Sequence, residues 1–212
     1  MGIDTMVMDN DSSKKRCWKY VFWTKKSKTY VFVGPTGSGK TTASLISRLY
    51  DVTKGTVLLH CKDIKSYTAS ERAEKIGFIL QDPILFTDTL RNNILYGNTE
   101  YKSITDKELK RILDNAQLSD LLQSFEQGLD TPITMGGDSI NLGQKQIIAF
   151  IRAILRKADL LILDEATANI DTVTEKQLEA ILSSLPKSTT KVIIAGSFNN
   201  AVELIMQEQG NN

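Results

Sequence analysis

The stretch that decides the fold is YVFVGPTGSGKTT, from Tyr30 to Thr42. Its four leading residues are apolar and predict a buried strand, and Gly34–Thr41 then fits the pattern G-x-x-x-x-G-K-[ST]. Glycines in this pattern let backbone N–H groups turn toward phosphate oxygens, and a following helix adds the partial positive charge of its first turn. Lys40 would bring a mobile cation to the β and γ phosphates, and the hydroxyl of Thr41 would ligate Mg²⁺. The alternative is a Gly-rich surface turn, which the strand–loop–helix setting disfavours.

Apolar runs that predict strands alternate with helical patterns along the chain. This alternation favours an α/β fold with a largely parallel core sheet, in which several strands are buried on both faces. With 212 residues, 41% of them apolar, the chain has the length and composition of one globular domain. The predicted strands are Tyr30–Val33, Thr56–His60, Ile76–Leu80, Leu160–Leu163 and Val192–Ala195, and the predicted helices are Lys40–Tyr50, Asp106–Phe125, Gln144–Arg156 and Glu175–Leu185.

Two carboxylates end the predicted strand in LLILDEAT, from Leu160 to Thr167. Open α/β sheets place their ligands at the carboxyl ends of strands. Asp164 would hold a metal ion directly or through water, and Glu165 would face an attacking water. Gln81, which follows another predicted strand, would offer its amide oxygen to a metal ion. The alternative is a buried strand with a solvated acidic end, which the phosphate-binding pattern elsewhere in the chain disfavours.

The charge balance and the cysteines limit the kinds of partner. The 26 basic and 25 acidic residues give a net charge of +1, so no overall field attracts nucleic acid or an anionic membrane. The basic and aromatic residues 14–28 are open to two interpretations: a surface for nucleic acid or lipid headgroups, or a solvated strand with a half-buried face, which we favour. Cys17 and Cys61 have no metal-ligand spacing, which predicts a reduced, cytosolic protein. The longest apolar run, Ile147–Ile151, is too short to predict a membrane helix.

Four further segments lie in order around these motifs. RLYDVTKGTVLL follows the phosphate-binding pattern, GFILQDPILFTDTLRNNILYGN contains Gln81, GGDSINLGQKQIIAFIRAIL precedes the acidic strand, and ATANID ends at Asp171. Together with the motifs above, they resemble the nucleotide-binding domain of an ATP-binding cassette (ABC) transporter, and most of all the exporter branch. The resemblance covers roughly Tyr30 to Asn200, which is nearly the whole chain.

The resemblance implies a fold and an activity. The fold is a P-loop NTPase (RecA-like) core with a mostly parallel sheet, a helical subdomain and a short N-terminal β region, all in one domain of residues 1–212. The core would comprise residues 30–81 and 144–200, and the helical subdomain residues 82–143. The implied activity is hydrolysis of ATP with Mg²⁺ by two such domains, which face each other head to tail and drive a separate transmembrane subunit or domain. The chain would then lie at the cytoplasmic face of a membrane, with no nucleic acid partner.

The resemblance also assigns roles to individual residues. The predicted catalytic residues are Glu165 and Gln81, the glutamine of the Q-loop, and Asp171 is the aspartate of the D-loop. Thr41, Gln81 and Asp164, the Walker B aspartate, are the predicted Mg²⁺ ligands. The signature motif of a partner domain would complete each ATP site. The predicted nucleotide-binding residues are Gly34, Pro35, Thr36, Gly37, Ser38, Gly39, Lys40, Thr41 and Thr42 of the Walker A loop, and Asn141, Gly143 and Gln144 of the signature motif.

Two departures from the family pattern concern the binding of ATP. The signature motif usually has a serine where this chain has Asn141, whose amide can still donate to a γ-phosphate oxygen but with a poorer fit. No aromatic ring stands between Met8 and Asp11, where the family stacks one on adenine, although Trp18 or Tyr20 could substitute. Loss of this stacking would weaken ATP binding roughly ten- to a hundredfold.

A third departure is Gly196 in KVIIAGSFNN, residues 191–200. The family has a histidine at this position, which reaches the γ-phosphate and the attacking water. Loss of one such group typically lowers the rate by about 10²–10⁴, so ATP binding is expected to outlast turnover. His60 would not replace the missing histidine, because it falls where the family has a turn between two short strands.

Four interpretations stay open. The chain is an ATP-hydrolysing transporter subunit, slow on its own and completed by a partner; or a degenerate module that binds ATP as a structural or regulatory ligand. A third is a cassette protein of DNA repair or translation, disfavoured because the chain lacks a long coiled coil, a second cassette and a basic surface. A fourth is a truncated product that folds but does little. Steady-state ATPase activity separates the first two, and co-purification of a membrane subunit separates both from the rest.

Overall fold

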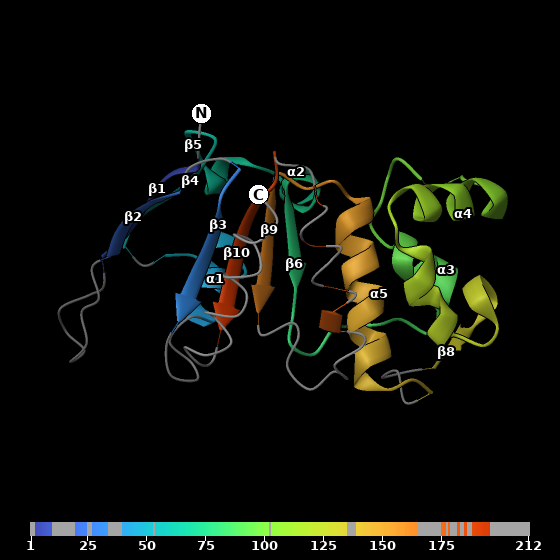
Figure 1. Ribbon diagram of the computed structural model, residues 1–212. Coiled ribbons are helices and arrows are strands. Elements are labelled where there is room, and N and C mark those ends of the chain that lie inside the picture. Colours follow the sequence, from blue (N-terminus) through green and yellow to red (C-terminus); the bar gives the residue numbers. More distant parts are fainter. Residues whose placement is uncertain are drawn as a thin grey trace.

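A parallel core sheet lies between an antiparallel sheet and a helical part (Figure 1). The structure is a computed structural model, and for residues 3–9, 20–24, 40, 41 and 54 it describes the backbone alone. The described residues are 3–9, 20–24, 27–33, 40–52, 54–101, 103–134, 139–164, 175, 176, 178, 182, 185 and 188–195.

Four parallel strands form the core sheet, in the order β3-β10-β9-β6. β10 pairs with β3 on one side and with β9 on the other, and β9 pairs in turn with β6. All five residues of β9 are buried, as its apolar run predicts for a strand that is covered on both faces. The predicted α/β fold with a parallel core sheet is confirmed. The strands are Thr29–Val33 (β3), Ile76–Ile79 (β6), Leu160–Asp164 (β9) and Thr190–Ala195 (β10).

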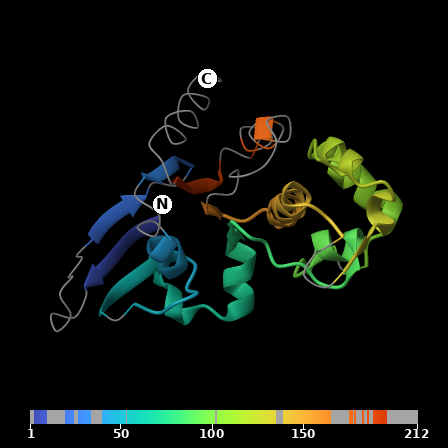
Figure 2. The ribbon, with the colours of Figure 1, turned by 90° about the horizontal axis from the view of Figure 1, so that it is seen from below.

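Different elements cover the two faces of the core sheet, because neighbouring residues of a strand point to opposite faces. Leu163 belongs to the buried cluster that α5 (Leu142–Leu155) and the helical part fill. Ile162, its neighbour in β9, belongs to the cluster on the other face, together with residues of α1 (Lys40–Ile46) and of the antiparallel sheet. Figure 2, seen from below, shows α1 and α5 on the two sides of the sheet.

The antiparallel sheet has the order β2-β1-β4-β5 and contains the predicted short N-terminal β region. The predicted strand Thr56–His60 lies in this sheet and not in the core sheet. It ends at Leu59, because His60 (φ 52°) and Cys61 (φ 62°) form a left-handed turn into β5. This places His60 in a turn between two strands, as predicted. The elements are β1 (Ile3–Asp9), β2 (Tyr20–Thr24), β4 (Lys54–Leu59) and β5 (Lys62–Asp63), followed by the 3-10 helix η1 (Ile64–Ser66) and the helix α2 (Ala69–Lys75).

The helical part lies beyond α5, on the side of the core away from the antiparallel sheet (Figure 1). None of its described elements adds a strand to the core sheet. A capping box starts α4: Glu108 N–H donates to Thr105 Oγ1 (3.3 Å), and Thr105 N–H donates to Glu108 Oε2 (3.0 Å). The predicted division of the chain at residues 82–143 stays a prediction. The elements are β7 (Asp88–Thr89), α3 (Leu90–Leu95), α4 (Asp106–Asn115), η2 (Ser119–Ser124), η3 (Gly128–Asp130) and β8 (Pro132–Ile133).

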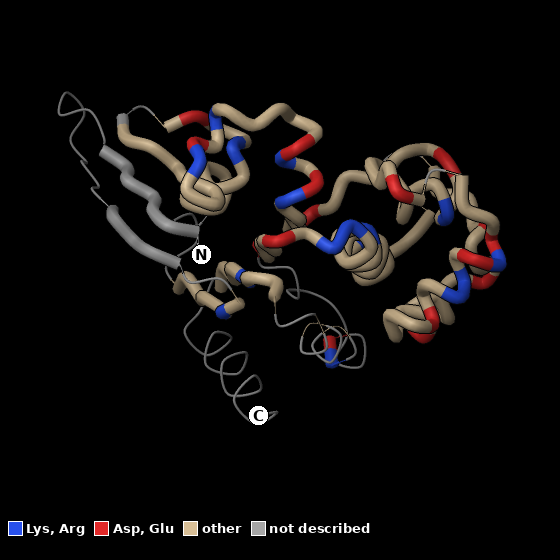
Figure 3. The backbone as a smooth tube through the Cα atoms, turned by 90° about the horizontal axis from the view of Figure 1, so that it is seen from above, with Lys and Arg blue, Asp and Glu red and all other residues tan. Residues whose placement is uncertain are grey.

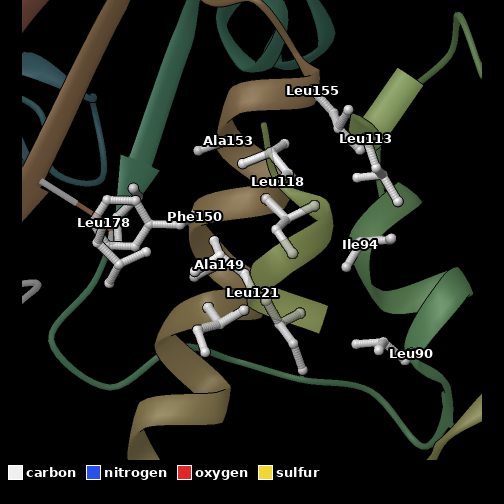
Figure 4. Packing of buried hydrophobic residues seen from close by; sticks show 14 of the residues in the cluster. Leu90, Ile94, Leu113, Leu118, Leu121, Ala149, Phe150, Ala153, Leu155 and Leu178 are labelled. Atoms are coloured by element: carbon white, nitrogen blue, oxygen red, sulfur yellow. The ribbon is translucent and has the colours of Figure 1, made fainter. Parts of the chain in front are cut away.

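One apolar cluster joins the helical part to α5 (Figure 4). Leu90 and Ile94 of α3 and Leu113 of α4 are fully buried, and so is Leu118 in the turn after α4. These side chains lie on the same side of α5 as Ala149 in the close view. The position of the helical part therefore depends on the apolar face of α5.

The predicted helical stretch Asp106–Phe125 is wrong in its length, because α4 ends at Asn115. Gln117 has a positive φ of 58°, and Leu118 N–H then bonds back to the carbonyl of Leu113 (2.8 Å). In a straight helix Leu118 would point about 140° away from Leu113, since each residue turns the helix by about 100°. The break lets both leucines enter the same cluster.

The other predicted helices differ less from the structure. The predicted helix Lys40–Tyr50 ends early, at Ile46, and Arg48 then has a positive φ of 56°. α5 begins two residues before the predicted Gln144. Of the predicted helix Glu175–Leu185, the structure describes residues 175, 176, 178 and 182 as helical, and Leu178 among them is fully buried.

We predict that Leu113→Ala lowers the free energy of unfolding by about 2–5 kcal/mol, because it leaves a cavity where the helical part meets α5. Leu113 has no exposed surface. Urea unfolding followed by circular dichroism would measure the change. The matched control is Leu49→Ala, whose side chain is 56% exposed and which should change the free energy by less than about 0.5 kcal/mol. Equal effects at the two positions would contradict the described cluster.

Candidate nucleotide site

The carboxyl ends of the core strands meet at one edge of the sheet, which we call the strand-end edge. The ladders pair Ala195 with Val33 and Ile194 with Asp164, and β6 ends beside Leu163. Figure 1 shows the four arrowheads along this edge. The segments that follow β3, β6, β9 and β10 in the sequence therefore all start from the strand-end edge.

Asp164 is the last residue of β9 and is only 7% exposed. Burial of a carboxylate is costly unless a cation or hydrogen-bond donors face it. The parallel register places its backbone between the ends of β10 and β6. The structure thus brings the predicted Walker B aspartate to the middle of the strand-end edge.

Several predicted site residues lie outside the described residues. Lys40 and Thr41 open α1, and the structure describes their backbone; Thr42 is half-buried behind them. For the predicted site residues outside the description, the assigned roles rest on the sequence alone. The residues outside the description are Gly34, Pro35, Thr36, Gly37, Ser38 and Gly39 of the predicted Walker A loop, together with Glu165, Asp171 and Gly196.

Gln81 lies two residues beyond β6 and is half-buried at the strand-end edge. Its backbone carbonyl accepts a hydrogen bond from Nε2 of Gln146 (2.5 Å), which also donates to the carbonyl of Leu80 (3.3 Å). Gln146 is not among the site residues predicted from the sequence. A signal was present, because Gln146 stands one helical turn before the apolar Phe150 and so falls on a face that must be buried.

The predicted signature motif begins α5 with a capping box. Asn141 Oδ1 accepts from Gln144 N–H (2.8 Å), and Gln144 Oε1 accepts from Asn141 N–H (3.0 Å). Gln144 Nε2 also donates to the carbonyl of Ser124 (2.7 Å). The side chain of Gln144 is thus used within the chain, while the capping bond of exposed Asn141 uses its oxygen and not its amide N–H₂. Their roles in nucleotide binding stay predictions.

His60 lies at the opposite edge of the core sheet. Its Nε2 is 3.8 Å from Oδ2 of Asp159, the residue before β9. Since β9 advances about 3.3 Å per residue, its five residues put His60 more than about 13 Å from the strand-end edge. The structure therefore agrees that His60 does not stand in for the histidine that the family pattern predicts at position 196.

An exposed apolar patch follows Gln81 in the chain and is not among the features predicted from the sequence. We define the Ile84 patch as Ile84 (65% exposed), Phe86 (39%) and Tyr96 (51%), with the two rings 4.1 Å apart between centroids. Arg152 of α5 donates from Nη1 to the carbonyl of Ile84 (3.1 Å) and from Nε to that of Asn93 (2.9 Å). Burial, and then the positive charge of Arg156, lower the pKa of Arg152 to about 10. Arg152 remains cationic at neutral pH beneath this patch.

Charge is spread over the described chain without a single-sign face (Figure 3). In the described ranges, no three His, Cys, Asp or Glu side chains group closely enough to hold a metal ion by themselves. In the same described ranges, no helix has the length and apolar character to span a bilayer.

The family model of the ABC transporter matches residues 20–168, which include β3, β6, α5 and β9. The chain belongs to the ABC transporter family. Its fold resembles the solved structure of a bacterial Atm1-family ABC exporter with ATP bound, with a TM-score of 0.76 and 28% identity over 96% of this chain and 35% of that one.

Curated relatives of this ABC transporter family member are much longer than the chain itself. It is 41% identical over 179 residues to the uncharacterized ABC transporter ATP-binding protein YfiC of Bacillus subtilis, covering 84% of this chain and 29% of the relative. It is 38% identical over 187 residues to the ATP-dependent lipid A-core flippase of Escherichia coli K12, covering 86% of this chain and 32% of the flippase. The chain thus spans about a third of the length of these relatives.

The residues at the strand-end edge fit Mg²⁺ better than a structural transition metal. Asp164 supplies a carboxylate and Gln81 an amide oxygen, and both lie at this edge. Mg²⁺ prefers oxygen ligands and needs only one or two from protein when phosphates supply others.

We predict that Asn141→Ala lowers the free energy of unfolding by about 0.5–2 kcal/mol, whereas Asn141→Ser leaves it nearly unchanged. Serine caps a helix as well as asparagine does, and alanine does not. Urea denaturation of the three proteins would measure this, with Asn115→Ala at the exposed end of α4 as the control. An Asn141→Ala variant as stable as wild type would mean that the cap does not stabilise α5.

Proposed function

We propose that this chain is the ATP-binding and ATP-hydrolysing part of an exporter-like ABC transporter, with slow turnover. The observation that carries the proposal is the strand-end edge, where buried Asp164 and half-buried Gln81 lie at the same edge of the sheet as the end of β3, the strand that leads into Gly34–Thr41. In α/β sheets this edge is where nucleotides bind. The family and the ABC exporter structure to which the chain is similar support the same function.

Each residue has a chemical task in this proposal. Backbone N–H groups of the Walker A loop other than at Pro35, together with the Lys40 ammonium, would hold the phosphates. Thr41, Gln81 and Asp164 would hold Mg²⁺, which would supply charge neutralisation at the phosphates. Glu165 orients and deprotonates the attacking water.

The second copy supplies the remaining contacts. In a head-to-tail dimer, Asn141 and the N–H groups at Gly143 approach the γ-phosphate that the partner copy holds. The capping bond of Asn141 leaves its amide N–H₂ as the donor for this contact. ATP thus links two copies, and its hydrolysis releases them.

The Ile84 patch supports a membrane partner. About two thirds of each long relative lies outside the matched region, and the patch exposes one aliphatic and two aromatic side chains between Gln81 and the end of α3 or just beyond it. Exposed apolar groups of this kind mark protein contacts. We assign the patch to the transmembrane domain that the ATP-driven dimer moves, so that the chain works at the cytoplasmic face of a membrane. No nucleic acid takes part.

A second candidate is a degenerate module that binds ATP for regulation and hardly hydrolyses it. The replacement of the usual histidine by Gly196 favours it, and so does Asn141 in place of the usual serine. Both changes act near the γ-phosphate and leave the Walker A loop intact. Steady-state release of phosphate, compared with ATP binding, separates the two candidates.

We predict that Lys40→Ala weakens the binding of a fluorescent ATP analogue by roughly ten- to a hundredfold, since a hydrogen bond to a charged group contributes about 1.5–3 kcal/mol. Fluorescence titration would measure both dissociation constants. Lys110→Ala, at an exposed position of α4, is the control and should leave the affinity unchanged. Equal affinities of wild type and Lys40→Ala would refute the phosphate site.

We also predict that Gly196→His raises ATPase turnover in a dimerising preparation, by up to about 10²-fold if the histidine is the limiting loss. Adding Asn141→Ser should raise it further, because the two groups act on one γ-phosphate from opposite copies. Glu165→Gln in that background should abolish the gain. Release of inorganic phosphate would measure turnover.

The melting temperature of each variant is the control for the Gly196 series. Glycine can occupy backbone conformations that histidine tolerates poorly, and strain would lower the melting temperature. An unchanged melting temperature with no rise in turnover would show that Gly196 is not the limiting loss.

A further inference from the structure

Gln146 carries a buried side-chain amide that has no assigned role in the proposed hydrolysis of ATP. It has no exposed surface, and it is one of four buried polar or charged residues among those that the structure describes. Its Nε2 donates to the backbone carbonyls of Leu80 (3.3 Å) and Gln81 (2.5 Å). A single amide thus bonds α5 to the segment that carries the predicted Q-loop glutamine.

These two carbonyls lie where the sheet can no longer pair them. The ladder between β6 and β9 ends at Ile79, opposite Leu163, and the chain then leaves the sheet toward the helical part. A backbone carbonyl beyond the last ladder position needs a donor from elsewhere. Gln146 supplies that donor from α5.

The same helix begins at the predicted signature motif. Asn141 caps α5, and Gln144 bonds the first turn to the carbonyl of Ser124 in the helical part. Gln146 follows Asn141 by five residues, a distance of about 7.5 Å along the helix axis. A displacement of the Gln81 backbone is therefore transmitted to the first turns of α5 through the hydrogen bond between Gln146 Nε2 and the carbonyl of Gln81.

Stability does not explain a glutamine at this position. Gln146 Oε1 is buried and accepts no hydrogen bond within the described part of the chain. An unsatisfied buried acceptor costs about 1–3 kcal/mol, which an apolar side chain of the same shape avoids. Leu80 and Gln81 are only half-buried, so water can reach this segment when the amide is absent.

We propose that Gln146 is a positioning residue that couples Gln81 to Asn141 within one copy. The inference rests on the proposed function, in which Gln81 serves the ATP on its own copy and Asn141 serves the ATP on the partner. Mg-ATP bound at one site then orders the motif that completes the other site. Gln146 does so without touching either nucleotide.

Amide hydrogen exchange of the full chain tests this coupling, at a concentration where light scattering shows a monomer. Mg-ATP should slow exchange at residues 79–86 and at residues 141–147 of wild type. In Gln146→Met, which keeps the shape and removes the donors, Mg-ATP should still slow exchange at 79–86. The slowing at 141–147 should disappear, a loss of about fivefold if the link equals one hydrogen bond of about 1 kcal/mol.

Two further measurements exclude a merely structural role. The melting temperature of Gln146→Met should stay within about 4 °C of wild type. Gln123→Met, at an exposed position of the helical part, is the matched control and should keep both slowed segments. The inference would be overturned if Mg-ATP slowed exchange at residues 141–147 as much in Gln146→Met as in wild type. No slowing anywhere in wild type would instead overturn the proposed function.

Gln146→Leu keeps the test decisive if the methionine variant does not fold. Leucine is also apolar and has no hydrogen-bond donor. In this variant Mg-ATP should again slow exchange at residues 79–86 and not at residues 141–147. Slowing at residues 141–147 equal to that of wild type would contradict the role of the donor.

Discussion

The pairing of β10 with β3 and β9 is the constraint on which the rest of the structure depends. Parallel pairing in a fixed register puts Val33, Asp164 and the end of β6 at one edge. A slip of one residue would exchange the two faces of a strand and expose its buried side chains, so the two apolar clusters hold the register in place. The core therefore positions this part of the predicted site, since the Walker A loop and the segments with Gln81 and Glu165 each continue a core strand whose end is already fixed.

α5 is the second organising element, because it joins the two parts of the molecule. Its apolar side chains fill the cluster shared with the helical part, while its polar ones bond to backbone carbonyls on other segments. Gln144, Gln146 and Arg152 each donate to a carbonyl that lies outside regular secondary-structure pairing or ends an element. Apolar contacts thus determine how strongly the core and the helical part are held together. Directional hydrogen bonds determine which backbone atoms move together.

The sequence predicts the parts of the fold that depend on local pattern. The apolar run before Asp164 predicts a buried strand, and the segment after Val33 predicts a phosphate-binding loop, because both patterns are contiguous in sequence. The membership of Thr56–His60 in the antiparallel sheet is not predictable in this way, since partner choice is a tertiary property. The break at Gln117 is hidden for a similar reason, because it is set by the burial of Leu118. The bond from Gln146 to Gln81 joins residues 65 apart in sequence, and no local pattern records it.

The pairing of β3 with β10 also affects how the chain can fold during its synthesis. β3 has no other partner in the described core sheet, and the bond from Ser27 N–H to Thr190 Oγ1 (3.1 Å) spans 163 residues. Closing so long a loop is slow, whereas the contacts within the helical part are local. A ribosome makes β3 and the phosphate-binding segment well before the strand that pairs with β3, since Ser27 and Thr190 are 163 residues apart. The nascent chain therefore carries an unpaired, apolar β3 until β10 is made, which is a stage at which chaperones would have a strand edge to protect.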